Sequence, residues 1–308
     1  MMPRPCIAVL AATLVAALLA GCGGGRSTSA HGGPTVVATT TQLGDMARAV
    51  AGRRAGVTQI LQPNSDPHEY EPRPSDVKAV AGAKVVLRSG GGLDDWLADV
   101  LNSAGNDAKA VTVIDALHTR RLGGAVDPHW WQNPRNGEIA VQRIRDALIA
   151  ADPGGRDGYT ANAAAFLQRL RALDRAIQAC VAAVPRAQRR IVTDHDALGY
   201  YADRYGIDVV GTVIPALSTQ AQASAASVAR LTRTIRHAGV TTIFSESSVN
   251  SNLAKAIARE SGAKVGPNLY ADSLGPEGSP GATYLGSLAF NTRAIVAGFG
   301  GDASRCGL

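Results

Sequence analysis

From residue 34 onward, short runs of β-branched and aliphatic residues alternate with longer stretches in which apolar residues recur every three or four positions. Short apolar runs are typical of strands buried on both faces, and the longer stretches are typical of amphipathic helices. Such alternation predicts βαβ units and parallel sheets. In the first half of the chain we expect strands at 35–39, 57–61, 84–88 and 110–114, with helices at 42–51, 74–81, 94–104 and 137–150.

The pattern changes between residues 159 and 184, where helical spacing continues over about seven turns without a Gly or Pro. A second βα series follows, with strands at 190–193, 208–210, 241–244 and 263–265 and helices at 198–205, within 218–238, 252–261 and 283–299. We therefore predict an α/β fold of two βα lobes with mainly parallel sheets. The N-terminal lobe would cover 35–150 and the C-terminal lobe 186–308, joined by one long backbone helix within 151–185.

The N-terminus has the pattern of an export signal. Arg4 precedes an uncharged apolar run from Cys6 to Ala20, which is shorter than the roughly 20 residues of a spanning helix. The run ends in Leu-Ala-Gly-Cys, which resembles a bacterial lipobox. This predicts a signal peptide over 1–21, a lipid on Cys22 and a flexible tether over 22–34, with the protein anchored to the outer face of the cell membrane. An uncleaved anchor or an ordinary secretory signal is the alternative.

Charge and cysteine content limit the kinds of binding partner and the pairing of cysteines that we expect. The net charge is +6, but Lys and Arg occur singly or in pairs without interleaved aromatic residues, which argues against a nucleic-acid-binding surface. Aromatic residues make up 5% of the chain, so we expect a core of Val, Leu, Ile and Ala. Cys180 and Cys306 would remain in a compartment that permits disulfides. The sequence alone allows either a disulfide between them or two free thiols.

Three of the six histidines follow predicted strands. His68 and His129 each end an Asp-Pro-His tripeptide, and His195 lies between Asp194 and Asp196. Ligands bind at the carboxyl ends of strands in open α/β sheets, and proline stiffens the backbone that presents the imidazole. Imidazoles suit zinc and its neighbours, and a ligating histidine usually donates its other N–H to a carboxylate or carbonyl. These residues therefore predict a transition-metal site, with the flanking aspartates as outer partners.

The remaining histidines have simpler explanations. His31 falls in the tether, His118 follows a strand and could lie on the rim of the site, and His237 ends a predicted helix, where a cation is favoured. A fourth ligand is expected from the second lobe, and both Glu246 and Asp272 follow strands there. We prefer Asp272 because it keeps the spacing of the ligands regular. Glu246 remains the alternative ligand or an outer partner.

Taken in order, these motifs resemble those of the cluster A-I, zinc/manganese-type solute-binding proteins of ABC importers. The resemblance runs from about Val36 to the C-terminus and is carried by the stretches 66–76, 127–134, 193–197 with Tyr200 and 205–206, 243–246 and 272–274. It implies two lobes joined by a backbone helix, with the metal between them. It also implies the ligands His68, His129, His195 and Asp272, zinc or manganese as transported ligand, and an ABC permease as partner. We expect a monomer.

Two departures from the family pattern bear on the metal. The stretch 117–126 is short, whereas many zinc-specific members have a long loop rich in histidine and acidic residues there; this puts an accessory scavenging role in doubt. Manganese-preferring members often have glutamate where this chain has His195. A third nitrogen ligand favours zinc, because manganese prefers carboxylate and water oxygens.

Two other classes of protein fit the sequence less well. A zinc hydrolase could use the same three histidines with Glu246 or Asp272 as general base, but it needs an open coordination position, and the usual hydrolase motifs are missing from the sequence. A siderophore or corrinoid receptor would need basic and aromatic groups in its cleft. We therefore predict a metal receptor and not an enzyme, with a manganese-preferring receptor as the main alternative. Tyr70, Trp130 and Trp131 are expected to form the wall of the site.

Overall fold

The computed structural model describes residues 32–106, 108 and 110–308. The signal peptide, Cys22, His31 and most of the tether lie outside the described residues. Residues 31–308 form one compact unit, and lobe boundaries at residues 150 and 185 stay a prediction. Within the described part of the chain, no helix has the length and apolar character needed to cross a bilayer.

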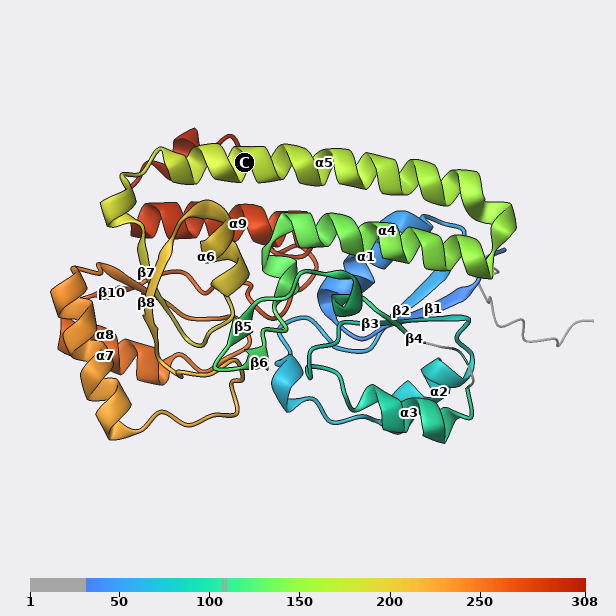
Figure 1. Cartoon of the computed structure of the whole chain (residues 1–308), viewed down its shortest axis with the longest axis horizontal. Coiled ribbons are helices and arrows are strands. Elements are labelled where there is room, and N and C mark those ends of the chain that lie inside the picture. The colour runs from blue at the N-terminus through green and yellow to red at the C-terminus, as the bar shows by residue number, and fades with distance from the viewer. Residues whose placement is uncertain (1–31, 107, 109) are drawn as a thin grey trace, which may run out of the picture. The chain divides into compact units, whose positions relative to one another are not determined.

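The first sheet has four parallel strands in the order β2-β1-β3-β4. Its central strand β1 is buried from Val36 to Ala38, because it has neighbours on both edges and helices over its faces (Figure 1). β4 ends two residues earlier than predicted, since a short 3₁₀ turn begins at Ile114. The strands are β1 (Thr35–Ala38), β2 (Gly56–Gln59), β3 (Val85–Arg88) and β4 (Ala110–Thr112).

The helices around this sheet start where capping chemistry allows. The hydroxyl of Thr40 accepts the N–H of Leu43 at the start of α1. α2 begins at Pro74, as predicted, since proline has no N–H to leave unpaired in a first turn. Asp76 then accepts the N–H of Arg73. The helices are α1 (Thr41–Ala51), α2 (Pro74–Ala81), α3 (Leu97–Ala104) and α4 (Pro134–Ala151).

The second sheet repeats this architecture with the parallel order β10-β9-β7-β8. Its strands are β7 (Arg190–Thr193), β8 (Asp208–Thr212), β9 (Thr242–Phe244) and β10 (Lys264–Val265). The accompanying helices are α6 (Gly199–Tyr205), α7 (Ala225–Ala238), α8 (Asn252–Ser261) and α9 (Tyr284–Gly298). Two parallel sheets and one connecting helix confirm the predicted fold class.

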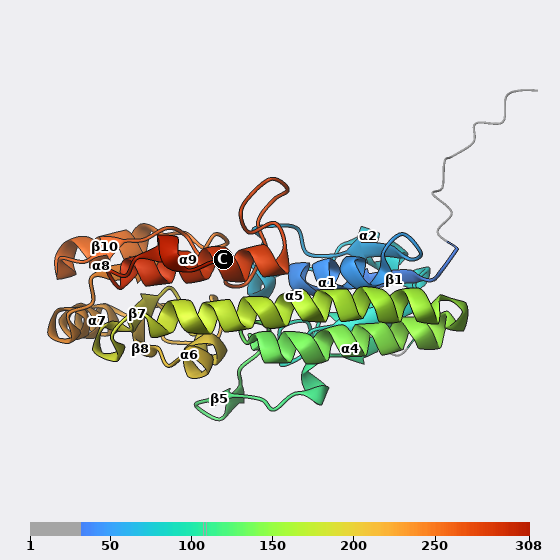
Figure 2. The ribbon, with the colours of Figure 1, turned by 90° about the horizontal axis from the view of Figure 1, so that it is seen from above.

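The connecting helix is α5 (Arg156–Ala182). It packs on α1 and α4 beside the first sheet and on α6 and α9 beside the second, so it runs along both (Figures 1 and 2). A disulfide joins Cys180, near its end, to Cys306. This bond fastens the C-terminal segment to the same helix.

A buried ion network joins three helices at the junction between the sheets. Asp174 on α5 is 2% exposed and accepts two hydrogen bonds from the guanidinium of Arg204 and one from the hydroxyl of Tyr205, both on α6. Arg135 of α4 lies 3.5 Å from the same carboxylate. The network therefore connects helices from both halves of the chain through α5.

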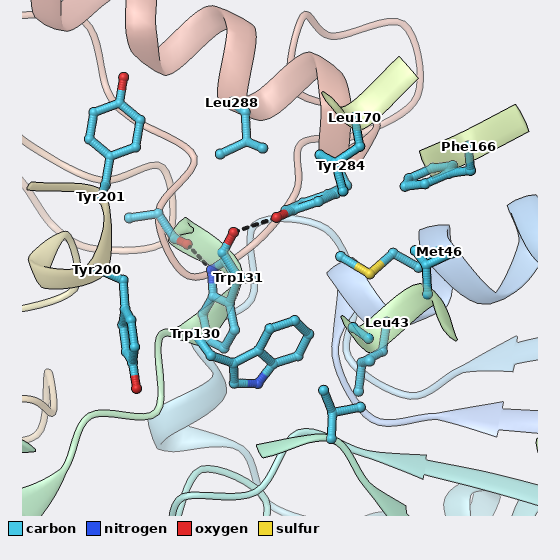
Figure 3. Close-up of a cluster of buried hydrophobic side chains, with 14 of the residues drawn as sticks. Leu43, Met46, Trp130, Trp131, Phe166, Leu170, Tyr200, Tyr201, Tyr284 and Leu288 are labelled. Atoms are coloured by element: carbon cyan, nitrogen blue, oxygen red, sulfur yellow. Dashed lines mark hydrogen bonds between the residues drawn. The ribbon is translucent and has the colours of Figure 1, made fainter. Parts of the chain in front are cut away.

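Aromatic side chains fill the centre of the junction, although the composition indicated a mainly aliphatic core. Trp130, Trp131, Tyr201 and Tyr284 are among the largest fully buried side chains. Figure 3 shows Trp131 between the two halves, with the hydroxyl of Tyr284 donating to its backbone carbonyl. Large aromatic side chains thus contribute to the core where the two halves meet.

Between β4 and α4 the chain forms a small antiparallel hairpin, β5 (Arg121–Leu122) and β6 (Ala125–Val126), within the stretch 117–126. Gly123 and Gly124 both have positive φ angles, which the tight turn requires. Strands of two residues are too short to give a hydrophobic pattern, so the sequence did not predict them.

Candidate metal centre

Three loops at the carboxyl ends of the strands present the three histidines. His68 lies in a 3₁₀ turn (Pro67–Glu69) after β2, and its backbone N–H donates to Asp66, which caps that turn. His129 precedes a second 3₁₀ turn (Trp130–Gln132), and its N–H donates to Asp127 in the same way. His195 follows β7 almost directly. In each Asp-Pro-His tripeptide the aspartate thus fixes the backbone that holds the imidazole.

The Nε2 atoms of the three rings meet the carboxylate of Asp272. His129 Nε2 lies 3.3 Å from both His68 Nε2 and His195 Nε2. Asp272 Oδ2 is 3.2 Å from His68 Nε2 and from His195 Nε2, and Oδ1 is 3.4 Å from His129 Nε2. A regular tetrahedron of zinc ligands with bonds of about 2.0–2.1 Å has edges of about 3.3–3.4 Å. These five distances are close to such edges, and one ligand atom from each of the four residues lies within 4.8 Å of every other, so the cluster could hold a metal ion.

Two imidazoles face carboxylates on their other nitrogen. His129 Nδ1 lies 2.8 Å from Asp127 Oδ1, and His195 Nδ1 lies 2.5 Å from Glu246 Oε1. A carboxylate in this position takes the N–H of a neutral imidazole and leaves the Nε2 lone pair free to bind a metal. Both rings are therefore oriented as ligands would be.

The same contacts separate the two candidate carboxylates of the second half. Asp272 lies with the three Nε2 atoms, whereas Glu246 lies against the opposite nitrogen of His195. Asp194 points to neither position, since its carboxylate accepts the backbone N–H of Glu246. Asp196 is half-buried, and its backbone N–H donates to the carbonyl of Ala216.

In this cluster, burial favours the neutral form of each side chain, whereas neighbouring opposite charges favour the charged form. His129, His195, Glu246 and Asp272 are at most 2% exposed. Burial lowers the pKa of His129, and it raises the pKa of Glu246 to about 7. Burial also disfavours charge on His195 and Asp272, but the attraction between opposite charges is stronger. Glu246 and Asp272 raise the pKa of His195 well above its ordinary value. His195 and His129 lower the pKa of Asp272 well below its ordinary value. A metal cation bound there would add positive charge next to these carboxylates.

The other predicted site residues lie elsewhere. His118 and His237 are exposed and do not join the cluster. Trp131 does form a wall, with its ring centroid 5.5 Å from that of His129. Trp130 is one layer further in, and its indole N–H donates to the hydroxyl of Ser89. Tyr70 packs on Trp96 and donates its hydroxyl to Asp76 at the start of α2, and its place in the wall stays a prediction.

Sequence reasoning missed several polar residues around the cluster. The side-chain amides of Gln42 and Gln132 donate to backbone carbonyls of residues 272 and 271. The hydroxyl of Tyr200 donates to the carbonyl of Asp127, and the Arg120 guanidinium contacts the carboxylate of Asp127. Gln132 lies inside the stretch 127–134 that the resemblance uses. Gln42 has no signal of its own in the sequence.

Three imidazoles and a carboxylate buried at the carboxyl ends of two parallel sheets define a candidate metal-binding protein of the two-lobed α/β class. The family model described as zinc-uptake complex component A, periplasmic, matches residues 36–298. The chain belongs to this family. Membership places it among the metal-binding components of uptake systems and not among enzyme families.

Relatives in the family are named for different metals. The manganese-binding lipoprotein MntA of Halalkalibacterium halodurans is 35% identical, over 92% of this chain and 95% of its own. The iron-binding protein YfeA of Yersinia pestis is 32% identical, over 86% of each chain. The structure of the periplasmic zinc-binding protein TroA of Treponema pallidum superposes with a TM-score of 0.82 at 27% identity, over 87% of this chain and 99% of TroA.

Proposed function

We propose that this protein captures a divalent transition metal outside the cell membrane and delivers it to the permease of an ABC importer. Its ligands would be His68, His129, His195 and Asp272, and zinc would be the preferred ion, with manganese second. A lipid on Cys22 would hold the protein at the outer face of the membrane, where it would act as a monomer.

The spacing of the four ligand groups carries this proposal. Five of their contacts measure 3.2–3.4 Å, close to the edges of a tetrahedral zinc site, and three nitrogen donors suit zinc better than manganese. The relatives do not decide the metal, because their names include manganese, iron and zinc. The preference for zinc therefore rests on the donor set.

Closed coordination also favours capture over catalysis. A catalytic zinc site has three protein ligands and an open position for water. Here Asp272 supplies a fourth ligand, and Glu246, the other candidate base, is engaged with His195 Nδ1. A receptor that binds and releases its ion fits this arrangement, and a zinc hydrolase does not.

The test is zinc titration of the mature, tag-free protein against a competing chromophoric chelator. We expect one equivalent of zinc to bind tightly. His68→Ala should weaken this binding at least about 100-fold, because it removes a metal ligand, and that loss is larger than the loss of an outer partner. His118→Ala is the matched control, since it removes an exposed histidine outside the cluster, and it should leave the affinity unchanged. Tight binding by the His68 variant would refute the ligand assignment.

Competition between zinc and manganese in the same sample would then decide the metal. We expect zinc to displace manganese at equal concentration, as the nitrogen-rich donor set requires. Displacement in the opposite direction would establish the manganese alternative while leaving the site and the receptor function in place.

A further inference from the structure

The segment that contains Asp272 is hydrogen-bonded to the second half of the molecule up to Tyr270 and to the first half from Ala271. Tyr270 is still held by its own half of the molecule: its N–H donates to the side chain of Asn291 on α9, and its carbonyl accepts from the same side chain. Leu269 likewise pairs with the strand extension after β9, through Ser245 and Ser247. Up to Tyr270, then, the chain belongs to the second sheet and its helices.

From Ala271 onward the donors and acceptors come from the first half. The carbonyl of Ala271 accepts the indole N–H of Trp131 at 2.8 Å and the amide of Gln132 at 2.7 Å. The carbonyl of Asp272 accepts the amide of Gln42 at 3.0 Å. Figure 3 shows the hydrogen bond at the indole nitrogen of Trp131.

Two more contacts continue this attachment. The N–H of Leu274 donates to the hydroxyl of Thr41 at 2.9 Å, and its carbonyl accepts the N–H of Asn64 at 3.0 Å. Residues 271–274 are at most 3% exposed, as are Thr41, Gln42, Trp131 and Gln132. Buried hydrogen bonds of this kind are costly to break without replacement. The segment is therefore firmly seated on the first half of the molecule.

The three bonds from Trp131, Gln132 and Gln42 act on the peptide planes on either side of Asp272. The carbonyl of Ala271 belongs to the plane before the Cα atom of Asp272, and the carbonyl of Asp272 belongs to the plane after it. Because peptide units are planar, holding both planes fixes the two backbone dihedrals of Asp272. The side chain then leaves the backbone in one direction, toward the three imidazoles.

We infer that Gln42 and Gln132, with Trp131, are positioning residues for the carboxylate of Asp272. By sequence, two of the ligands come from each half, but residues 271–274, which carry Asp272, are held by hydrogen bonds from the first half. This inference rests on the proposed metal site, to which it adds residues that contact no metal themselves.

A double-mutant cycle tests the inference. Gln42→Met and Gln132→Met keep the side-chain length and remove the amide donors. The double variant Q42M/Q132M should bind zinc about 10–100-fold more weakly, the loss typical of outer partners of a metal ligand. In a D272A background the same two substitutions should change the affinity less than about 3-fold, because they act through the side chain that is already missing.

The ligand field of bound Co²⁺ gives an independent signal. The visible absorption of Co²⁺ should shift in Q42M/Q132M and stay unchanged between D272A and the triple variant. Asn162→Leu is the matched control: it removes an amide donor from α5 to the backbone carbonyl of Val50 on α1, and it should alter neither the affinity nor the spectrum. Circular dichroism of the metal-free variants confirms that each is folded.

The outcomes separate the inference from the proposed function. An equal loss of affinity in both backgrounds would mean that the glutamines only support packing, and no loss in either would mean that Asp272 is placed by its own half; both results overturn the inference. If D272A alone binds zinc as tightly as the parent, the proposed ligand set is wrong, and the inference is overturned with it.

Discussion

At the scale of single residues, the side of the imidazole on which a carboxylate lies decides its role. Asp272 is at the Nε2 side of three rings, while Glu246 is at the Nδ1 side of His195. The first position suits a metal ligand, and the second suits a group that orients the ligand and raises its basicity. Two buried acids on neighbouring loops thus lie on opposite sides of the His195 ring, and the proposed roles differ through this geometry.

Replacing Glu246 by Gln should weaken zinc binding about 10–100-fold without abolishing it, because His195 would lose the carboxylate that orients its ring. Asp196→Asn is the control, since it neutralises the residue after His195 without changing what Nδ1 faces. Chelator competition measures both affinities. A loss as large as that of D272A would instead indicate that Glu246 binds the metal itself.

Sequence reasoning could find the histidines but could not rank these acids. Asp-Pro-His after a predicted strand is a local pattern, and the rule that ligands bind at strand ends brings distant examples together. The choice between Glu246 and Asp272 depends on side-chain direction, which spacing along the chain does not contain. The roles of Gln42 and Gln132 depend on contacts with residues 230 and 139 positions away in the sequence, so no local pattern could show them.

At the scale of elements, the ion network around Asp174 couples α5 to its neighbours. The Arg204 guanidinium is partly exposed, but the carboxylate is buried and accepts three charge-assisted or hydroxyl hydrogen bonds. Burial of Asp174 acts against its charge, yet the bonds from Arg204 and Tyr205 prevail and its pKa falls below the ordinary value of 3.8. The charged form therefore stabilises the junction of the three helices.

Asp174→Asn should lower the free energy of unfolding by about 2–4 kcal/mol at pH 7, since a buried guanidinium contact is broken. A group with a depressed pKa in the folded state contributes its stability above its unfolded pKa and loses it as pH falls through the folded value. The difference between parent and variant should thus be constant at neutral pH and shrink below about pH 4.

Urea unfolding from pH 3 to 8 measures this difference. Asp146→Asn provides the control, because that carboxylate is exposed on α4 and pairs with its neighbour Arg145, a contact worth little. A gap that persists unchanged at pH 3 would show that the charge of Asp174 is not the cause.

Hydrophobic spacing predicted the long helix and the succession of strands and helices along the chain. The predicted and observed bounds differ mostly by one to three residues. Periodicity reports burial along one element and carries this information well. It failed for β5 and β6, whose strands have two residues each. It also failed to show that aromatic residues gather at the junction, because partners such as Trp131 and Tyr284 are far apart in the chain.

At the scale of the whole molecule, metal binding should be coupled to stability. The ligands come from both halves of the chain, so an ion held by all four favours the folded state. At a free zinc concentration 100 times the Kd, the gain is about 2.7 kcal/mol, and the melting temperature should rise accordingly.

This gain should shrink as pH falls, because the imidazoles must lose their protons to bind metal. The pKa of His195 is raised by Glu246 and Asp272 against the effect of burial, so protons compete for this ring even near neutral pH. Thermal melts with and without zinc between pH 5 and 8 measure the effect. A gain that does not depend on pH would exclude a histidine site.

Trp131 combines two of these features, since its ring lies edge-on to that of His129 and its N–H is bonded to Ala271. Indole fluorescence is sensitive to nearby charge and is quenched by ions with unpaired electrons, whereas zinc has a filled d shell. The emission of the native protein should therefore respond differently to zinc and to manganese. The molecule contains its own optical reporter of which ion has entered, and no label is needed to follow loading in real time.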